Sequence, residues 1–555
     1  MTAVPSPSPS PGAATATTLA EAFATTVAAQ PDAVAVRTLD GSTAYSWREL
    51  DRQARRFASG LAGLGVGPGD SVGVMLTNDL PFYVADLAAV FLGAVPVPIY
   101  ATASPEQIAH VAEDAHLKAA VTQESLAPSL LAGLEDRSDC PVVCVEAGVF
   151  GTVPWAEVAA AEPLAPVHAA APDELLTIIY TSGTTGASKG VELTHGAVLA
   201  SAAAVSGFAG MQEGGTVISW LPLAHIAERV ASYYMAITCG LEVVVCPDPK
   251  RVAEYLPQVQ PSFFFAVPRF WEKLRGGIEA KVAGLPEEAQ EAFAAREPGL
   301  MGGLRQLIGF GELKVAAIGA APSDPELIEF FHELGVPLGE IYGMTENAAC
   351  CTANPRDAIR IGSAGVPMPG TEVRIAADGE VEMRGPVLMR GYRGLPDQTA
   401  DAFTVDGFLR TGDIGRLDDD GYLWIFDRKK DVMINSGGKN MSPSNIEAAI
   451  KSGGPEIGHV CVVGDARAYN VALVVPDPDV VGLPHEWPAD LEARIAAAVA
   501  AGNARLSRVE QVKRYHLVRD VWEPGSDLLT PTLKLRRPGA HRLYATEIDA
   551  LYSAE

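Results

Sequence analysis

Short apolar segments that alternate with helical patterns constrain the fold more than any other feature of this chain. Each segment is rich in Val, Ile, Leu or Phe, which is typical of strands buried on both faces of a parallel sheet. The segments are SVGVML (71–76), VVCV (142–145), LLTIIY (175–180), TVISWL (216–221), LEVVVC (241–246), SFFFAV (262–267) and LKVAAIG (313–319). Because parallel strands need long, usually helical connections, this order predicts an α/β fold with doubly wound sheets.

The pattern changes after about residue 360. Three short segments with glycine turns, GVPMPGTEVRI, GEVEMRG and GYLWIFDR, predict a small β-barrel-like subdomain. After DRKKD (427–431), helical and strand patterns mix again. We therefore predict a flexible tail at 1–18, a large N-terminal domain at 19–427, a hinge at 428–431 and a small, mobile α+β lid domain at 432–555.

The composition is acidic and excludes some classes of function. Lys and Arg number 42 against 68 Asp and Glu, so the formal net charge of the 555 residues is −26. Such a surface repels a phosphate backbone, which argues against general nucleic-acid binding. The seven cysteines form no C-x-x-C pair and mostly stand beside or close to Val, Ile or Ala. This favours reduced, buried thiols in a cytoplasmic protein and disfavours a structural metal site.

The most membrane-like stretch runs from 83 to 100, but Asp86, Pro96 and Pro98 interrupt it. We expect a buried helix followed by a strand there, and no transmembrane segment. The N-terminus alternates Ser and Pro and lacks the basic and apolar regions of a signal peptide. Peripheral contact with a membrane is left open.

The stretch YTSGTTGASKG at 180–190 is the first candidate site. It follows the apolar segment at 175–180 and precedes a pattern that is helical from His195. A glycine-rich turn between a strand and a helix presents backbone N–H groups to an anion, and a polyphosphate fits such a loop best. The donors we expect are Thr181, Ser182, Gly183, Thr184, Thr185 and Lys189. The Walker pattern G-x-x-x-x-G-K-S/T does not fit, because Lys189 precedes its glycine, so an ordinary P-loop NTPase is disfavoured.

Residues 181–190 resemble the phosphate-loop signature of the acyl-adenylate-forming superfamily, which includes acyl-CoA synthetases, the adenylation domains of peptide synthetases and firefly luciferase. Segments similar to its other motifs follow in order: LPLAHIAER (221–229), IGAAPSD (318–324), GEIYGMTE (339–346), LRTGDIGRLDDDGYLWIFDRKKDVMINSGGKNMSPSNIE (409–447) and LTPTLKLRR (529–537). The last two look most like long-chain fatty acyl-CoA synthetases. The resemblance spans about residues 20–540. It implies that a carboxylic acid is joined to CoA through an acyl-AMP, with ATP and Mg²⁺ required.

The resemblance also implies roles for individual residues. Lys534 would reach the α-phosphate and the carboxylate in the first step, Thr345 would donate to the α-phosphate, and His225 would position the carboxylate. Glu346 would bind Mg²⁺, a hard cation that prefers oxygen ligands. Tyr342 would stack on adenine and Asp413 would accept hydrogen bonds from the ribose. The remaining ATP-binding positions are Gly319, Ala320, Ala321, Gly343, Ile425 and Arg428.

The segment around Lys430 resembles the hinge of that superfamily. Rotation about it would withdraw Lys534 and bring in Gly437, Gly438 and Lys439, where the two glycines would leave a narrow path for the pantetheine arm of CoA.

The choice of acid is predicted only in part. Amino-acid-activating relatives carry an Asp where this chain has Leu223, and within that segment no carboxylate stands before Glu228. This favours an apolar acid over an α-amino acid, while chain length and aryl acids stay open. Two other hypotheses remain: an adenylating enzyme that loads a carrier protein, and a nucleotide-binding protein without activity. The presence of Lys534, Glu346 and Lys189 together argues against the latter.

Overall fold

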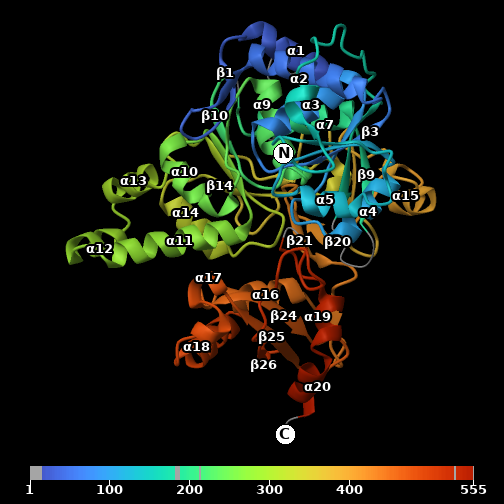
Figure 1. Ribbon diagram of the computed structural model, residues 1–555. Coiled ribbons are helices and arrows are strands. Elements are labelled where there is room, and N and C mark those ends of the chain that lie inside the picture. The colour runs from blue at the N-terminus through green and yellow to red at the C-terminus, as the bar shows by residue number, and fades with distance from the viewer. Residues whose placement is uncertain (1–15, 182–187, 212–213, 531–532, 554–555) are drawn as a thin grey trace.

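The chain folds into a large N-terminal domain and a smaller C-terminal domain that lies beneath it (Figure 1). The computed structural model describes residues 16–181, 188–211, 214–530 and 533–553. Both domains mix helices and strands, so the predicted α/β class and the division into a large and a small domain are confirmed. No helix in these described ranges is both long enough and apolar enough to cross a membrane.

A five-stranded parallel sheet forms one part of the N-terminal domain. Its order is β4 (Val95–Pro98), β3 (Ser71–Met75), β5 (Leu117–Thr122), β6 (Val142–Cys144) and β7 (Val153–Pro154). Helix α3 (Leu80–Leu92) is buried along almost its whole length and leads into β4. The interrupted apolar stretch is therefore a buried helix and a strand, as predicted.

Two further sheets complete the doubly wound part of the domain. One has the order β10 (Thr216–Ser219), β11 (Glu242–Val245), β1 (Val34–Arg37) and β2 (Ala44–Ser46). The other has the order β12 (Phe263–Ala266), β13 (Val315–Ile318), β14 (Leu338–Tyr342), β15 (Thr352–Ala353) and β16 (Val366–Pro367). Strands β12, β13 and β14 are parallel, so their carboxyl ends meet at one edge, where Tyr342 ends β14.

The candidate phosphate loop corrects one expectation. Strand β8 (Leu175–Thr181) pairs antiparallel with β9 (Lys189–Thr194), and β19 (Gly391–Tyr392) pairs with β9 on its other side. The loop thus joins two antiparallel strands, and not a strand to a helix. Lys189 stands opposite Thr181 in the ladder, because the β-branched and apolar residues after Gly190 extend the strand before the helix begins at His195.

The glycine-punctuated segments after residue 360 form the predicted β-rich subdomain. They make an antiparallel sheet of β17 (Glu372–Ile375), β18 (Glu380–Arg384), β20 (Leu409–Leu417) and β21 (Leu423–Arg428). The C-terminal domain holds a sheet of β24 (Ile457–Val463), β25 (Asn470–Pro476) and β26 (Val512–Leu517), and a small ribbon of β22 (Met433–Ile434) and β23 (Asn440–Met441).

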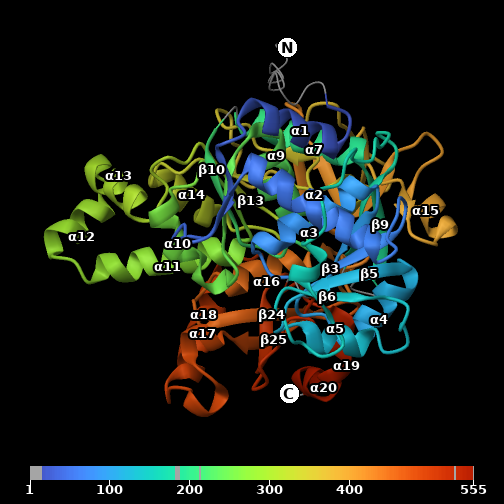
Figure 2. The same ribbon diagram turned by 45° about the horizontal axis from the view of Figure 1, so that its top comes forward.

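Helices cover the sheets of both domains. Those of the N-terminal domain are α1 (Leu19–Ala29), α2 (Trp47–Gly63), α3, α4 (Pro105–Asp114), α5 (Ala127–Gly133), α6 (Trp155–Val158), α7 (His195–Phe208), α8 (Ile226–Glu228), α9 (Met235–Cys239), α10 (Val252–Val259), α11 (Pro268–Ala283), α12 (Glu287–Ala294), α13 (Pro298–Leu307), α14 (Pro325–Glu333) and α15 (Pro396–Ala402). Those of the C-terminal domain are α16 (Pro443–Lys451), α17 (Pro478–Val481), α18 (Leu491–Ala504), α19 (Arg537–Leu543) and α20 (Ala545–Ser553). Helices α11, α12 and α13 extend away from the body as an arm (Figure 2).

Ion pairs join the two domains. At the base of the arm, Arg269 lies against Asp477, Lys273 against Asp479, and Glu272 lies 3.1 Å from Lys451. At the start of α14, Asp324 lies 2.8 Å and Glu326 3.0 Å from Arg505. These ion pairs between charged side chains therefore help to hold the C-terminal domain in its present orientation against the N-terminal domain.

Candidate active site

Tyr342, Asp413 and Arg428 meet where two sheets of the N-terminal domain approach each other. Asp413 on β20 is the cross-strand partner of Arg428 on β21, and Arg428 Nε lies 2.9 Å from Asp413 Oδ1. Tyr342 at the end of β14 donates its hydroxyl hydrogen bond to Asp413 Oδ2 at 2.5 Å. Burial raises the pKa of Asp413, while Arg428, Tyr342 and Lys534 act against that rise. Ile425 lies on β21 opposite Gly415, behind this group.

Lys534 of the C-terminal domain acts on the same group through its charge, with no ion pair within 4 Å to Asp413 or Glu346 among the described residues. Its ammonium is electrostatically coupled to Asp413, Glu346, Arg428 and His225. Although its side chain keeps exposed surface, desolvation within the cleft, followed by the charge of Arg428, lowers the pKa of Lys534. Its backbone N–H donates to Thr530 Oγ1 at 3.0 Å, and Leu533 before it has a left-handed φ of 62°. The backbone directly before this lysine is thus held in a conformation that costs free energy for a residue with a side chain.

The side chains of Glu346 and Lys189 both contact the side chain of Tyr392. The hydroxyl of Tyr392 donates to Glu346 Oε1 at 2.9 Å, and the ammonium of Lys189 lies 4.6 Å from the centre of the Tyr392 ring. The backbone carbonyl of Glu346 accepts a hydrogen bond from Met389 N at 2.8 Å. Within the described residues Glu346 Oε2 accepts no hydrogen bond, so it is the oxygen open to a cation.

Helix α4 contacts strand β8 and the residue that precedes β9, next to the candidate phosphate loop; strands β8 and β9 and the loop between them are called the phosphate hairpin below. The Tyr180 hydroxyl donates to Asp114 Oδ2 at 2.5 Å, and His110 Nε2 lies 2.7 Å from the carbonyl oxygen of Ser188. Thr181 and Lys189 face each other just above these contacts. The predicted donors Ser182, Gly183, Thr184 and Thr185 lie outside the described residues.

The backbone at two of the predicted adenine-side residues, Ala320 and Gly343, is sterically constrained. Ala320 has a left-handed φ of 68°, a conformation that costs free energy for a residue with a side chain, and it stands between Gly319 and Ala321. At Gly343, a Cβ atom would come within 2.0 Å of the Ala349 carbonyl oxygen, so no larger residue fits there. Thr345 then begins a short 3₁₀ helix, Thr345–Asn347, which carries Glu346.

His225 caps the one-turn helix α8. Its Nδ1 accepts a hydrogen bond from Ala227 N at 3.2 Å. Burial, together with the charge of Lys534, lowers the pKa of His225 to about 3. The imidazole is therefore neutral near pH 7, and because Nδ1 is an acceptor, Nε2 carries the proton and can donate.

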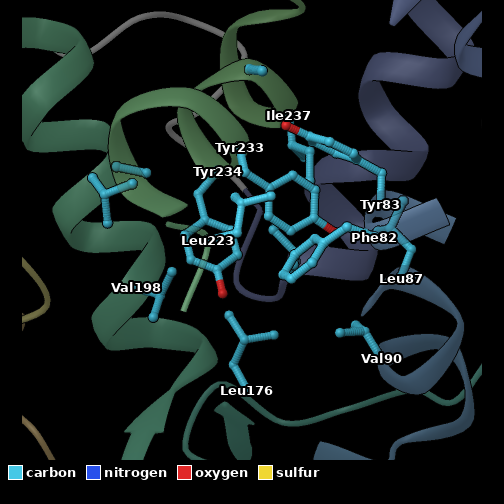
Figure 3. Packing of buried hydrophobic residues seen from close by; sticks show 14 of the residues in the cluster. Phe82, Tyr83, Leu87, Val90, Leu176, Val198, Leu223, Tyr233, Tyr234 and Ile237 are labelled. Atoms are coloured by element: carbon cyan, nitrogen blue, oxygen red, sulfur yellow. The ribbon is translucent and has the colours of Figure 1, made fainter. Parts of the chain in front are cut away.

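A buried ion pair follows directly after α8. Arg229 donates to both carboxylate oxygens of Asp86 at 2.9 and 2.6 Å and to the Tyr234 hydroxyl at 2.7 Å, and neither charged side chain has any exposed surface. The ring centres of Tyr233 and Tyr234 lie 5.6 and 5.0 Å from the guanidinium of Arg229, and Figure 3 shows both tyrosines in the apolar cluster that includes Leu223. The chain from Arg229 to Tyr234 is a π-helix, a rare form often found at functional sites.

Glu228 lies at the other end of this group. Its Oε1 accepts hydrogen bonds from Ser232 Oγ at 2.7 Å and from Trp220 N at 3.2 Å. Burial raises the pKa of Glu228 to about 7. The charged groups in the wall behind His225 and Leu223 are therefore buried and hydrogen-bonded, except that Arg229 Nη1 has no partner among the described residues.

A narrow apolar cavity lies between α7 and the sheet that ends in Tyr342. Its volume is about 30 Å³, close to that of one water molecule, and it is lined by Val205, Phe208, Phe263, Ile341, Cys350 and Met368, among others. Ile341 directly precedes Tyr342, so the cavity runs along the strand that carries the candidate nucleotide contact.

The predicted hinge begins at Arg428, which belongs to the group around Asp413, and the predicted CoA residues follow it in the C-terminal domain. Lys430 is in the turn after β21, where the ammonium of Lys429 pairs with Asp378 at 2.6 Å and Glu380 at 2.8 Å. Gly437, Gly438 and Lys439 form an exposed turn between β22 and β23, with Gly438 at a φ of 78°. The amides of Gly437 and Lys439 donate to the Asn435 side chain, each at 3.0 Å.

Sequence reasoning missed Tyr392, Asp86 and Arg229 as site residues. For the ion pair a signal existed: Asp86 in an otherwise apolar helix requires a buried partner of opposite charge. For Tyr392 no local signal existed, because its role depends on two contacts made across the fold.

Comparison with known proteins gives a consistent result. Residues 23–393 match the family described as AMP-binding enzyme, and residues 430–555 match the family described as AMP-binding enzyme C-terminal domain. A protein of Mycobacterium tuberculosis, provisionally named fatty-acid–CoA ligase fadD11, is 43% identical over 430 residues, which cover 70% of this chain and 75% of that protein. The long-chain-fatty-acid–CoA ligase FadD15 of Mycobacterium bovis is 30% identical, with 94% of each chain covered.

Solved structures show the same fold at lower identity. The adenylation domain of a carboxylate reductase from Mycobacterium chelonae superposes with a TM-score of 0.82 at 22% identity, covering 97% of this chain and 91% of that one. The anthranilate CoA ligase AuaEII, solved with anthranoyl-AMP, gives a TM-score of 0.79 at 19% identity, covering 96% and 98%.

Proposed function

Because the chain belongs to the family of AMP-binding enzymes, we propose that it joins a fatty acid to CoA through an acyl-adenylate, with ATP consumed and AMP and pyrophosphate released. The observation that carries the proposal is the position of Lys534: a lysine of the C-terminal domain, preceded by the left-handed Leu533, interacts electrostatically with Asp413 and Glu346 of the N-terminal domain. A nucleotide between them would be gripped by both domains.

In the first step, a carboxylate attacks the α-phosphate, so negative charge is brought to negative charge. Donors that are already oriented lower such a barrier most when water is excluded. Lys534 and Arg428 supply positive charge at one side, and Lys189 supplies it at the phosphate hairpin. Asp413 would accept hydrogen bonds from the ribose hydroxyls in place of the one it now receives from Tyr342.

His225 would orient the acid. Since its imidazole is neutral and protonated at Nε2, it can donate a hydrogen bond to a carboxylate oxygen without removing the nucleophile's charge. It would act by positioning, and not as a general base, because Nδ1 is already engaged with Ala227.

Mg²⁺ fits the donors present. Glu346 offers a carboxylate oxygen that is open among the described residues, and Mg²⁺ usually takes one or two carboxylates together with substrate phosphates. No group of three His, Cys, Asp or Glu side chains that could hold a metal ion is found in the described ranges, so the phosphates and water would complete the shell. The ion would offset phosphate charge when bound.

The acid proposed is aliphatic. The apolar cavity along β14 would receive the acyl chain, and each buried CH₂ would add about 0.8 kcal/mol. Because the cavity holds about 30 Å³, side chains such as Phe208 and Met368 must move before a long chain enters. Leu223 is buried and apolar, which favours such a chain over an amino acid.

The second step would need a different orientation. We place the hinge at residues 428–431, with the exposed turn at Gly437, Gly438 and Lys439 replacing Lys534 and guiding the thiol of CoA. A carrier protein is the alternative acceptor, and cytoplasmic action remains our expectation from the seven buried thiols.

The test is pyrophosphate exchange with short, medium, long and aromatic acids, followed by transfer to CoA or to a holo carrier protein. We expect exchange with an aliphatic acid and transfer to CoA. No exchange with any acid would contradict an adenylating function, and transfer only to the carrier would favour the alternative acceptor.

A further inference from the structure

Tyr392 stands between two charged residues that the proposed reaction must keep separate. Its hydroxyl donates to Glu346 Oε1 at 2.9 Å, while its ring lies under the ammonium of Lys189 at 4.6 Å. Among the described residues Lys189 and Glu346 both contact Tyr392 and form no direct ion pair with each other. One side chain therefore satisfies both a cation and a carboxylate.

The fold holds Tyr392 in this place through its backbone. Tyr392 on β19 is paired with Val191 on β9, and Lys189 lies two residues before Val191, on the same face of the sheet. Such diagonal neighbours are within reach of an aromatic ring. The Tyr392 amide also donates to Thr399 Oγ1 at 2.9 Å, which ties β19 to α15.

The segment that leads into β19 also binds the backbone of Glu346. Its carbonyl oxygen accepts a hydrogen bond from Met389 N at 2.8 Å, three residues before Tyr392. A lysine and a glutamate in one cleft attract each other strongly when water is scarce. If Lys189 and Glu346 paired directly, Lys189 could not bind the phosphates and Glu346 could not bind the metal ion.

We propose that Tyr392 is a positioning residue that holds the phosphate-side Lys189 and the metal-side Glu346 apart, so that each remains available to its own part of a bound Mg²⁺–nucleotide. This inference rests on the proposed function. Its ring faces the cation and its hydroxyl binds the carboxylate, so both charges are stabilised without neutralising each other.

Two substitutions separate the two contacts. Tyr392→Phe keeps the ring under Lys189 but removes the donor to Glu346. Tyr392→Leu removes both and lets Lys189 and Glu346 pair. Tyr422→Phe is the matched control, because Tyr422 also lies under a guanidinium, Arg360 at 4.1 Å, and donates its hydroxyl to a carbonyl oxygen, that of Ala358, away from the site.

The measurement is calorimetric binding of α,β-methylene-ATP to the full-length protein, with EDTA and across a Mg²⁺ series. For Tyr392→Phe we expect unchanged affinity in EDTA and about a tenfold rise in the Mg²⁺ concentration at half-saturation, as for other residues that orient a metal ligand. For Tyr392→Leu we expect weaker binding in EDTA as well. Adding Glu346→Gln to Tyr392→Leu should restore the affinity in EDTA, because the competing carboxylate is gone.

A merely structural tyrosine would not give that restoration. Two results would overturn the positioning role alone. One is that both Tyr392 variants bind the analogue as tightly as the wild type, and the other is that Glu346→Gln does not restore the affinity lost in Tyr392→Leu. Failure of the wild type both to bind the analogue and to exchange pyrophosphate would overturn the proposed function and this inference with it.

Discussion

Two charged regions of the molecule are built in opposite ways. In the Asp86–Arg229 pair behind the candidate acid site, which has no exposed surface, Nη2 of Arg229 donates to both oxygens of Asp86, whereas the Lys273–Asp479 pair between the domains is 44% and 56% exposed. A buried pair is costly to break, since one partner is left as an uncompensated charge, while an exposed pair contributes little and is screened by salt. The difference teaches that the charges of the N-terminal wall are fully buried, whereas the pairs that hold the C-terminal domain range from mostly buried, as in Arg269–Asp477 at 22% and 6% exposed, to exposed ones that are easily exchanged.

The largest effect is expected from breaking the buried pair. Asp86→Ala should lower the free energy of unfolding of the N-terminal domain by about 3–5 kcal/mol, because Arg229 stays buried without its carboxylate. Urea denaturation followed by tryptophan fluorescence measures it. The double variant Asp86→Leu/Arg229→Met should lose much less, and an Asp86→Ala variant as stable as the wild type would show that this pair does not stabilise the wall.

The next largest effect is expected from Lys534, the residue of the C-terminal domain whose charge acts on the N-terminal site. Lys534→Ala should slow formation of acyl-AMP by about 10²–10³-fold, since an oriented positive charge at the phosphate is removed. Thiolysis of supplied acyl-AMP should be nearly unchanged. The exposed Lys513→Ala serves as the control on the same domain. Equal loss of both half-reactions would count against two orientations.

A pH prediction follows from the proton on Glu228. The folded chain holds this proton up to a pKa of about 7, whereas the unfolded carboxyl releases it near 4.5. The folded state therefore binds more protons between these values, and its stability falls as pH rises through that window. At about 1.4 kcal/mol per pKa unit, the loss reaches at most about 3 kcal/mol.

Glu228→Gln cannot lose a proton, so its unfolding free energy should change less between pH 5 and pH 8 than that of the wild type. The exposed Glu291→Gln is the control and should keep the wild-type slope. Identical slopes in Glu228→Gln and the wild type would show that the buried carboxyl is not protonated in the folded chain.

The smallest effect is expected at the domain interface. Arg505→Ala removes the pairs with Asp324 and Glu326, each partly exposed, and should shift the balance between orientations by about 0.2–1 kcal/mol. Adenylation should slow and thiolysis of supplied acyl-AMP should speed up by a corresponding factor.

The effect of Arg505→Ala should vanish near 1 M salt, where the Debye length is about 3 Å. Arg296→Ala removes a similarly exposed pair with Glu333 inside one domain and should leave the ratio of the half-reactions unchanged. A salt-independent change in Arg505→Ala would mean that the interface does not act through charge.

The sequence predicted the local elements better than their connections. Helix α16 begins at Pro443 with Ser442 as its N-cap, and both signals can be read from the sequence because the cap and the fixed φ of proline are local. The phosphate hairpin was misread, because a strand after a glycine-rich loop is decided by its pairing with β8 and β19, which sequence spacing does not reveal. Asp413 and Arg428 were named separately, and their contact depends on the register of β20 and β21.

The direct test of the account is hydrogen–deuterium exchange of the whole protein, with a non-hydrolysable acyl-AMP analogue alone and together with CoA. We predict that the amides of the exposed turn residues Gly437 and Gly438, which donate only to Asn435 within that turn, gain protection only when CoA is added, while the segment around Lys534 loses protection and residues 83–92 stay protected in both states. Unchanged exchange at both C-terminal segments, or equal change in the N-terminal wall, would contradict a fixed wall served by an exchanging domain.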